Sequence, residues 1–197
     1  MKKLSRVQVA QEAAKFMLDG AENEYLHAKE RATIKLGISG HNHFPSNKTV
    51  KGMISLLAKV ELGEGEIKKR VRRMREIALE IMLIIEDNDP FLIGSTLSGK
   101  IRATSDIDLH AYADDPTEIQ EKLELCGFTD IELEEIENLK GYFMHLKWEE
   151  EGFPVEITVY PWKNRDVKPI SSVTGKLMKR ADVKALNKIL ALEQKKK

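Results

Sequence analysis

The chain has 197 residues, of which 42% are hydrophobic and 32% charged, and its formal net charge is zero. This composition is that of an ordinary soluble globular protein, and it excludes the disordered and membrane-spanning classes. The single cysteine, Cys126, excludes an internal disulfide, and we expect it to be buried. Because no apolar leader follows Met1, we expect a cytoplasmic protein with no membrane partner.

The net charge of zero hides a segregation of acidic and basic residues along the chain. Residues 91–160 hold 5 Lys and Arg against 16 Asp and Glu, whereas residues 161–197 hold 11 against 3. An acidic middle beside a basic end is compatible with a cation site bordered by polyanion-binding surfaces. Solvated surface faces explain the same pattern, and for most of the charges we favour this second interpretation.

Apolar residues three or four positions apart predict helices over most of residues 1–88, which we treat as a helical N-terminal region. The first stretch carries Val7, Ala10, Ala14, Met17, Tyr25, Ala28 and Ala32 in this spacing. Ser46 and Asn47 are predicted N-caps of a later helix, and Gly63-Glu64-Gly65 ends that helix. A homo-oligomer formed through this region is compatible with the pattern.

The most regular helical segment carries one apolar stripe. Its members are Ile67, Val71, Met74, Ile77, Ala78, Ile81, Met82 and Ile85. The basic residues between Lys68 and Arg75 lie mostly away from this stripe, on a face that is either solvated or in contact with RNA. We favour the solvated face, because it is the commoner arrangement.

From Phe91 the pattern changes to short apolar runs separated by turn residues, which is typical of strands. The predicted strands are Phe91 to Ile93, Ile107 to Ala111, Ile131 to Leu133, Tyr142 to Trp148 and Val155 to Tyr160. A helix is predicted from Pro116 to Leu125, with Ile119, Leu123 and Leu125 facing inward. The fold class is therefore α+β, with a small mixed sheet over residues 89–162 and a basic C-terminal segment, residues 163–197, that ends in a helix.

The segment from Gly94 to Leu109 holds the most informative residues. Asp106 and Asp108 are two positions apart in a predicted strand, so both side chains lie on one face. Two like charges held this close repel each other, and a divalent cation with oxygen ligands is the obvious compensation. The Gly94-Ser95 turn supplies backbone N–H groups and a hydroxyl that suit phosphate oxygens.

A third carboxylate comes from the last predicted strand. Val155, Ile157 and Val159 share one face of that strand, and Glu156 lies on the other. Acidic residues are depleted in strands, so Glu156 is a candidate third metal ligand. Two Mg²⁺ ions held by three carboxylates suit in-line phosphoryl or nucleotidyl transfer, because one ion activates the attacking hydroxyl and the other stabilises the leaving oxygen.

The Gly94-Ser95 turn, followed after ten residues by Asp106-Ile107-Asp108-Leu109, resembles the minimal nucleotidyltransferases of the polymerase-β superfamily. The resemblance covers roughly residues 90–160. It implies a palm-like core, a nucleoside triphosphate bound by Gly94 and Ser95, and two metal ions on Asp106, Asp108 and Glu156. Ser98 stands where many minimal members carry an Arg, and Lys100 or Arg102 could take its place.

The acceptor stays open at this point between an RNA end, a protein hydroxyl and a small molecule. A non-catalytic nucleotide- or RNA-binding regulatory module is the alternative function. A P-loop is rejected, because Ile101 stands where a P-loop has the Ser or Thr that binds magnesium. Tyr160 and Trp162 either stack on a base or, more often for such residues, close a core.

Overall fold

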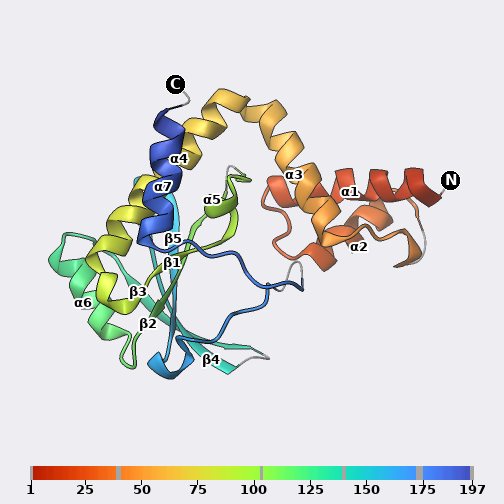
Figure 1. The fold of residues 1–197 in the computed structure, drawn as a ribbon. Helices are drawn as coiled ribbons and strands as arrows, with labels where there is room; N and C mark the ends of the chain where they lie inside the picture. The colour runs from red at the N-terminus through yellow and green to blue at the C-terminus, as the bar shows by residue number, and fades with distance from the viewer. Residues whose placement is uncertain (1, 39–40, 103, 139–140, 172–174, 196–197) are drawn as a thin grey trace. The chain divides into compact units, whose positions relative to one another are not determined.

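The computed structural model describes residues 2–38, 41–102, 104–138, 141–171 and 175–195 (Figure 1). The chain divides into two compact units. Unit 1 comprises Met1–Ile67, Ile101–Thr104 and Ser171–Lys176, and unit 2 comprises Lys68–Lys100, Ser105–Ile170 and Leu177–Lys197. Each unit is described by itself below.

Unit 1 is helical, as the periodicity predicted. It contains α1 (Lys2–Leu18), α2 (Tyr25–Lys35), the short 3₁₀ helix η1 (His41–His43) and α3 (Asn47–Leu62). Ala10, Ala14 and Met17 are buried as expected, whereas Val7 is 49% exposed, so its predicted place in the apolar stripe is wrong. The predicted cap is confirmed at Ser46, whose Oγ accepts a hydrogen bond from the Thr49 N–H at 3.1 Å.

The loop Ile101–Thr104 belongs to unit 1, although it connects two segments of unit 2. Ile101 is 1% exposed, and Arg102 Nη1 donates a hydrogen bond to the Met17 carbonyl oxygen at 3.0 Å. Arg102, suggested above as a substitute phosphate contact, therefore has a partner at the end of α1.

Helix α4 (Glu64–Ile84) begins directly after the predicted Gly63 break, and the 3₁₀ helix η2 (Glu86–Asn88) follows it. All eight residues of the predicted apolar stripe are buried, so this prediction is confirmed. The basic face differs from the expectation at one end. Arg75 is only 7% exposed, because its guanidinium is enclosed by polar partners, and it does not belong to the solvated face.

Unit 2 contains a five-stranded mixed sheet in the order β1-β2-β5-β4-β3. The strands are β1 (Phe91–Leu92), β2 (Ile107–Tyr112), β3 (Glu132–Asn138), β4 (Gly141–Glu150) and β5 (Phe153–Tyr160). The central pair β2 and β5 is parallel, and the other neighbours are antiparallel. The predicted α+β class with a small mixed sheet is therefore confirmed, although β3 extends five residues beyond the predicted end at Leu133.

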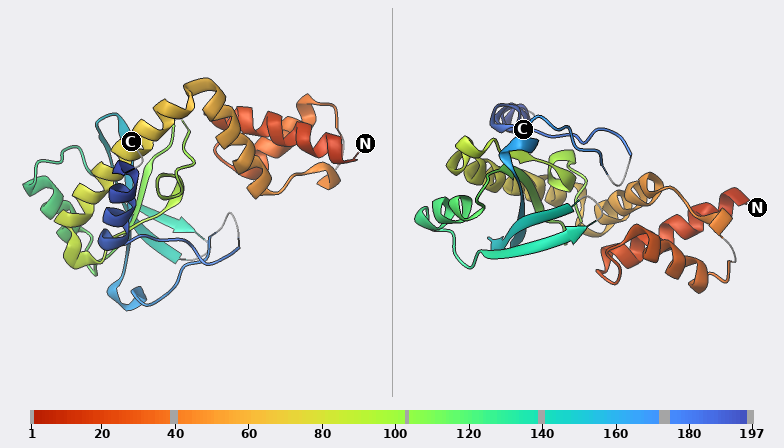
Figure 2. Two further views of the ribbon diagram at one scale, coloured as in Figure 1. Left: turned by 45° about the horizontal axis from the view of Figure 1, so that its top comes forward. Right: turned by 90° about the horizontal axis from the view of Figure 1, so that it is seen from below.

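The remaining helices of unit 2 are α5 (Gly94–Ser98), α6 (Thr117–Leu125), the 3₁₀ helix η3 (Trp162–Asn164) and α7 (Val183–Gln194). α4 and α6 lie side by side along the sheet (Figures 1 and 2). Ile119 and Leu123 are buried as predicted, but Leu125 is 87% exposed and Cys126 is exposed. Both predictions were wrong: Leu125 comes two residues after Leu123, which at 3.6 residues per turn puts it on the opposite side of α6, and Cys126 is the C-cap that follows the helix.

The two faces of this sheet differ in chemistry. Ile107, Leu109, Val155 and Ile157 lie on one face and are all at most 2% exposed. Asp108 and Glu156 lie on the opposite face and are half-buried. Alternation along β2 and β5 therefore creates one apolar face and one polar face from the same two strands. In the described part of the chain, no helix has the length and apolar character needed to cross a membrane.

Candidate nucleotide and metal site

The parallel pairing of β2 and β5 places two of the three predicted carboxylates next to each other. Asp108 is the register partner of Glu156, so the two side chains leave neighbouring strands on the same face. Asp106 directly precedes β2, one residue before its first member, and keeps the alternation, because it is half-buried between buried Ser105 and Ile107. Asp106 therefore lies just before β2, which begins at Ile107.

The Gly94 turn packs directly against Asp108. Gly94 has φ +70°, a conformation that favours glycine, and a Cβ atom built on it would lie 2.0 Å from Asp108 Oδ2. The Ile93 N–H donates to the Asp108 carbonyl oxygen at 3.0 Å, which fixes the start of the turn to β2. Only a residue without a side chain lets the carboxylate of Asp108 lie over the backbone of the turn.

Helix α5 presents Ser95 and Thr96 beside the carboxylates. Thr96 is fully buried, and its Oγ1 donates to the Asp106 carbonyl oxygen at 2.8 Å, so the turn and the first aspartate are joined. The Ser95 Oγ is shielded from solvent and has no hydrogen-bond partner among the described residues. A buried hydroxyl without a partner costs free energy, and an anionic ligand oxygen would satisfy it.

Glu156 contacts two basic side chains of β4. His145 Nδ1 lies 2.8 Å from Glu156 Oε1, and Lys147 Nζ lies 3.8 Å from Oε2. The hydrogen bond from His145 lowers the pKa of the Glu156 carboxyl below its ordinary value, against the opposing effect of burial, and the nearby charges of His145, Lys147 and His110 act in the same direction as the hydrogen bond. Glu156 therefore carries a negative charge at neutral pH.

The donor set of the polar face consists of hard oxygen ligands, which suit Mg²⁺. Within the described ranges, however, no three His, Cys, Asp or Glu side chains gather in a geometry that could hold a metal ion. The Glu156 carboxylate contacts His145 and Lys147. The strand register places Glu156 beside Asp108, and its side chain is engaged by β4.

His145 and Lys147 were missed by the sequence reasoning. Their signal is the alternation within β4, where both lie between the apolar residues Met144, Leu146 and Trp148. Lys147 is the register partner of Glu156, so Asp108, Glu156 and Lys147 form one row across three strands. Strand pairing, and not the local pattern, assembles this row.

A cluster of aromatic residues lies farther along the same face. Tyr160 lies four residues beyond Glu156, with its ring centroid 4.9 Å from His110 and 5.3 Å from Phe143. Trp162 stacks on Tyr112, which is buried, with ring centroids 6.4 Å apart. These rings pack mainly on one another, which agrees with the commoner interpretation that they close a core.

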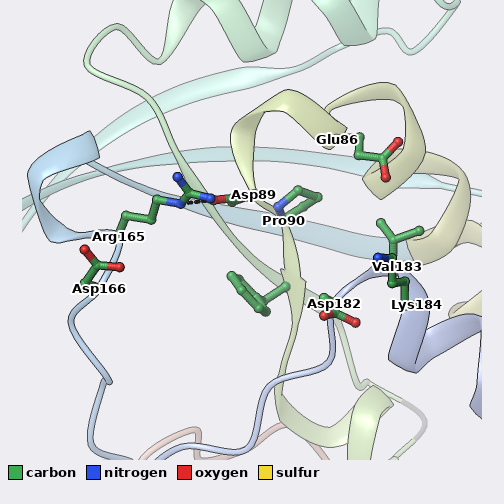
Figure 3. A pocket seen from close by; sticks show the side chains of 9 residues that line it. Glu86, Asp89, Pro90, Arg165, Asp166, Asp182, Val183 and Lys184 are labelled. Atoms are coloured by element: carbon green, nitrogen blue, oxygen red, sulfur yellow. Dashed lines mark ion pairs between the residues drawn. The ribbon is translucent and has the colours of Figure 1, made fainter.

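A cavity of about 360 Å³ lies elsewhere in unit 2 (Figure 3). It is lined by Glu86, Asp89, Pro90, Phe91, Arg165, Asp166, Asp182, Val183 and Lys184. Arg165 and Asp89 form an ion pair across it, and Asp182 accepts a hydrogen bond from the Ala185 N–H as the N-cap of α7. None of the predicted site residues lines this cavity.

The basic residues of α4 are largely matched by acids of unit 2. Arg72 pairs with Glu76 at 2.8 Å, and Arg73 pairs with both Glu76 and Glu151. Pairing reduces the positive charge that this face offers to a polyanion. The arrangement agrees with a solvated surface, as favoured from the sequence.

No protein-family model matches the chain, and no curated protein matches it. Among solved structures, the chain is similar to Cid1, described as an RNA terminal uridylyl transferase (19% identity, TM-score 0.35), over 46% of this chain and 30% of that chain. It is similar to a cytoplasmic RNA terminal U-transferase, with 20% identity and a TM-score of 0.35 over 55% of this chain and 34% of that chain. It is also similar to the Cid1 poly(U) polymerase, with 18% identity and a TM-score of 0.34 over 55% of this chain and 35% of that chain. The chain thus spans about a third of the length of these proteins, and the case for the site rests on the geometry above.

Proposed function

We propose that the polar face of the unit 2 sheet is the active site of a metal-dependent nucleotidyltransferase that moves a nucleoside monophosphate from a nucleoside triphosphate to a hydroxyl acceptor. The observation that carries the proposal is the packing of the Asp108 carboxylate on the backbone of Gly94, with Glu156 in register beside it. This packing puts a carboxylate next to a turn whose Ser95 hydroxyl has no partner among the described residues.

Each residue has a distinct role in this proposal. The Gly94 and Ser95 N–H groups and the Ser95 hydroxyl bind the phosphates, while Thr96 holds the backbone of Asp106 against the turn. Asp106, Asp108 and Glu156 would hold Mg²⁺, once Glu156 is released from His145. Bound Mg²⁺ would supply charge stabilisation at the transferring phosphoryl group.

His145 and Lys147 keep Glu156 ionised and are placed to donate hydrogen bonds on the polar face. The acceptor contributes its hydroxyl oxygen to the new phosphorus–oxygen bond, and pyrophosphate leaves with the electrons of the broken bond. RNA is one of the acceptors to be screened.

A second candidate function is a non-catalytic nucleotide-binding module. It is favoured by one observation, the engagement of Glu156 by His145 and Lys147, because these side chains compete with a metal ion for the third carboxylate. In this version, the Gly94 turn still binds a nucleotide and no transfer follows.

Calorimetry of nucleoside triphosphate binding tests the proposal, with and without Mg²⁺. We expect Mg²⁺-dependent binding by the wild type and its loss in the Asp106→Asn, Asp108→Asn double variant. Asp87→Asn, an exposed aspartate of η2, is the matched control and keeps the affinity. No binding by the wild type under any metal condition would exclude both candidate functions, and binding without pyrophosphate release on any acceptor class would favour the second.

A further inference from the structure

We propose that Arg75 of α4, together with Glu193 of α7, is the positioning device that holds the Gly94–Ser98 helix in its nucleotide-binding conformation. The inference rests on the proposed function of the Gly94 turn and deepens it. Arg75 is a positioning residue in this proposal, because it acts through α5 and not on the nucleotide. It stands at the end of the basic run that the sequence placed on a solvated face.

The guanidinium of Arg75 binds the carbonyl oxygens that α5 leaves open at its last turn. Nε donates to the Thr96 carbonyl oxygen at 3.0 Å, and Nη2 donates to the Leu97 carbonyl oxygen at 2.7 Å. The final carbonyl groups of a helix have no intrahelical partner, so a helix of five residues depends on outside donors. Arg75 supplies two of them from one rigid, planar group.

One of these two α5 residues, Thr96, also contacts the candidate site. Thr96, whose carbonyl oxygen Arg75 binds, donates through its side chain to the Asp106 carbonyl oxygen. Thr96 therefore links Arg75 to Asp106 by two hydrogen bonds, and Ser95 directly precedes Thr96 in the chain. A shift of α5 would move the Ser95 hydroxyl and the first aspartate together.

Glu193 completes the device from α7. Arg75 Nη1 donates to Glu193 Oε1, and the second oxygen, Oε2, is shielded from solvent without a hydrogen-bond partner among the described residues. Only 8% of the Arg75 side chain is exposed. A guanidinium buried to this extent needs both its carbonyl acceptors and a counter-charge, and the three partners come from two different helices.

The planar shape of the guanidinium restricts what can replace Arg75. A Cβ atom on Gly99, the left-handed C-cap of α5 at φ +69°, would lie 3.4 Å from Arg75 Nη2. A lysine keeps the charge for Glu193, but its single ammonium group cannot reproduce the flat fork that spans two successive carbonyl groups.

Arg73 provides a matched control on the same helix. It also pairs with a glutamate of unit 2, Glu151, but its side chain is 43% exposed, and it contacts the carboxylates of Glu76 and Glu151 rather than α5 carbonyl groups. Replacing Arg73 therefore removes an arginine–glutamate pair from α4 without touching the Gly94 turn.

The test compares wild type, Arg75→Lys, the Arg75→Met, Glu193→Met double variant and Arg73→Met. The double variant removes both charges of the pair, so it avoids leaving the half-buried Glu193 carboxylate unpaired, which would itself destabilise the fold. Two quantities are measured well below the melting temperature: the affinity for Mg²⁺ with a nucleoside triphosphate, and amide hydrogen exchange of Gly94–Ser98. We expect the double variant and Arg75→Lys to lose about tenfold in affinity, which corresponds to about 1.4 kcal/mol, and to exchange faster in α5, while Arg73→Met matches the wild type.

The outcomes are distinguishable. Nucleotide affinity and α5 protection equal to the wild type in the double variant would overturn the role of Arg75. Equal losses in Arg73→Met would also overturn it, because the effect would then follow general stability. Absence of nucleotide binding by the wild type would overturn the proposed function and with it this role.

Discussion

The two faces of the unit 2 sheet are built from alternate residues of the same strands, and they have opposite chemistry. On one face, Leu109 and Ile157 are register partners and are essentially inaccessible to solvent. On the other face, the partners one position earlier are Asp108 and Glu156, both half-buried. A shift of one residue in either strand would exchange the two faces.

This comparison shows how the apolar face specifies the polar one. Burial of the Leu109 and Ile157 row penalises any other register of β2 and β5, because a slip would bury carboxylates and expose aliphatic side chains. The side-by-side placement of Asp108 and Glu156, which costs free energy by itself, is therefore stabilised from the opposite side of the sheet. Substitutions on one face at a time test whether the apolar face determines stability and the polar face determines nucleotide binding.

The largest expected effect is on the apolar face. Ile157→Ala removes a side chain with no exposed area and leaves a cavity, so we expect a loss of about 2–5 kcal/mol in the free energy of unfolding. Thr158→Ala, the next residue along β5 and on the polar face, is the control, with a loss below about 1 kcal/mol. Chemical denaturation measures both, and equal losses would contradict the division between the faces.

The next effect is at the turn that meets the polar face. Gly94→Ala places a Cβ atom 2.0 Å from Asp108 Oδ2 at a backbone φ of +70°, so the carboxylate must rotate away from the turn. We expect a loss of about 1–2 kcal/mol in stability and of nucleotide affinity.

Gly127→Ala is the matched control for this substitution. Gly127 also has a positive φ, +98°, but no atom lies within 4 Å of its Cβ position. Its loss of stability reports the backbone strain alone, and its nucleotide affinity stays at the wild-type value. A control variant that also lost nucleotide affinity would show that strain, and not contact with Asp108, is responsible.

Much of this comparison was predictable from the sequence. Alternation predicted the faces of β2 and β5 and the shared side of Asp106 and Asp108, and the 3.6-residue period predicted the buried stripe of α4. These patterns are local, so the sequence contains them directly. The Gly94 turn was also local, because a glycine followed by Ser95 between two strands is a turn signal.

The parts that were missed depend on contacts between distant segments. His145 and Lys147 meet Glu156 only because β4 pairs with β5, and Arg75 is buried only because α5 and α7 supply acceptors for it. Strand order and helix packing decide such cases, and a single sequence does not encode them as a local pattern.

A smaller effect is expected at the ion pair of the polar face. His145→Leu removes the hydrogen bond that lowers the pKa of Glu156, so this pKa rises toward the ordinary value. A lowered folded-state pKa adds stability above the unfolded value, about 4.3 for Glu, and this stability is lost as the pH falls through the folded value. We expect the variant to be about 1 kcal/mol less stable at pH 7 and the difference to shrink in acid. A difference that stayed constant down to pH 3 would show that packing, not the charge of Glu156, is responsible.

The smallest effect concerns Tyr160, at the aromatic end of the polar face. Burial raises the pKa of the Tyr160 hydroxyl above its ordinary value, and the neighbouring Tyr112 acts in the same direction. A raised folded-state pKa means that the associated stability is present below the unfolded value, about 10 for Tyr, and is lost as the pH rises through the folded value. Absorbance titration of wild type and Tyr160→Phe should therefore show a late-ionising tyrosine in the wild type that is missing in the variant, in addition to Tyr25, whose pKa is also raised by burial. If Tyr160 ionised at its ordinary pKa, this end of the face would be as wet as the Glu156 end, and the polar face would be uniform along its length.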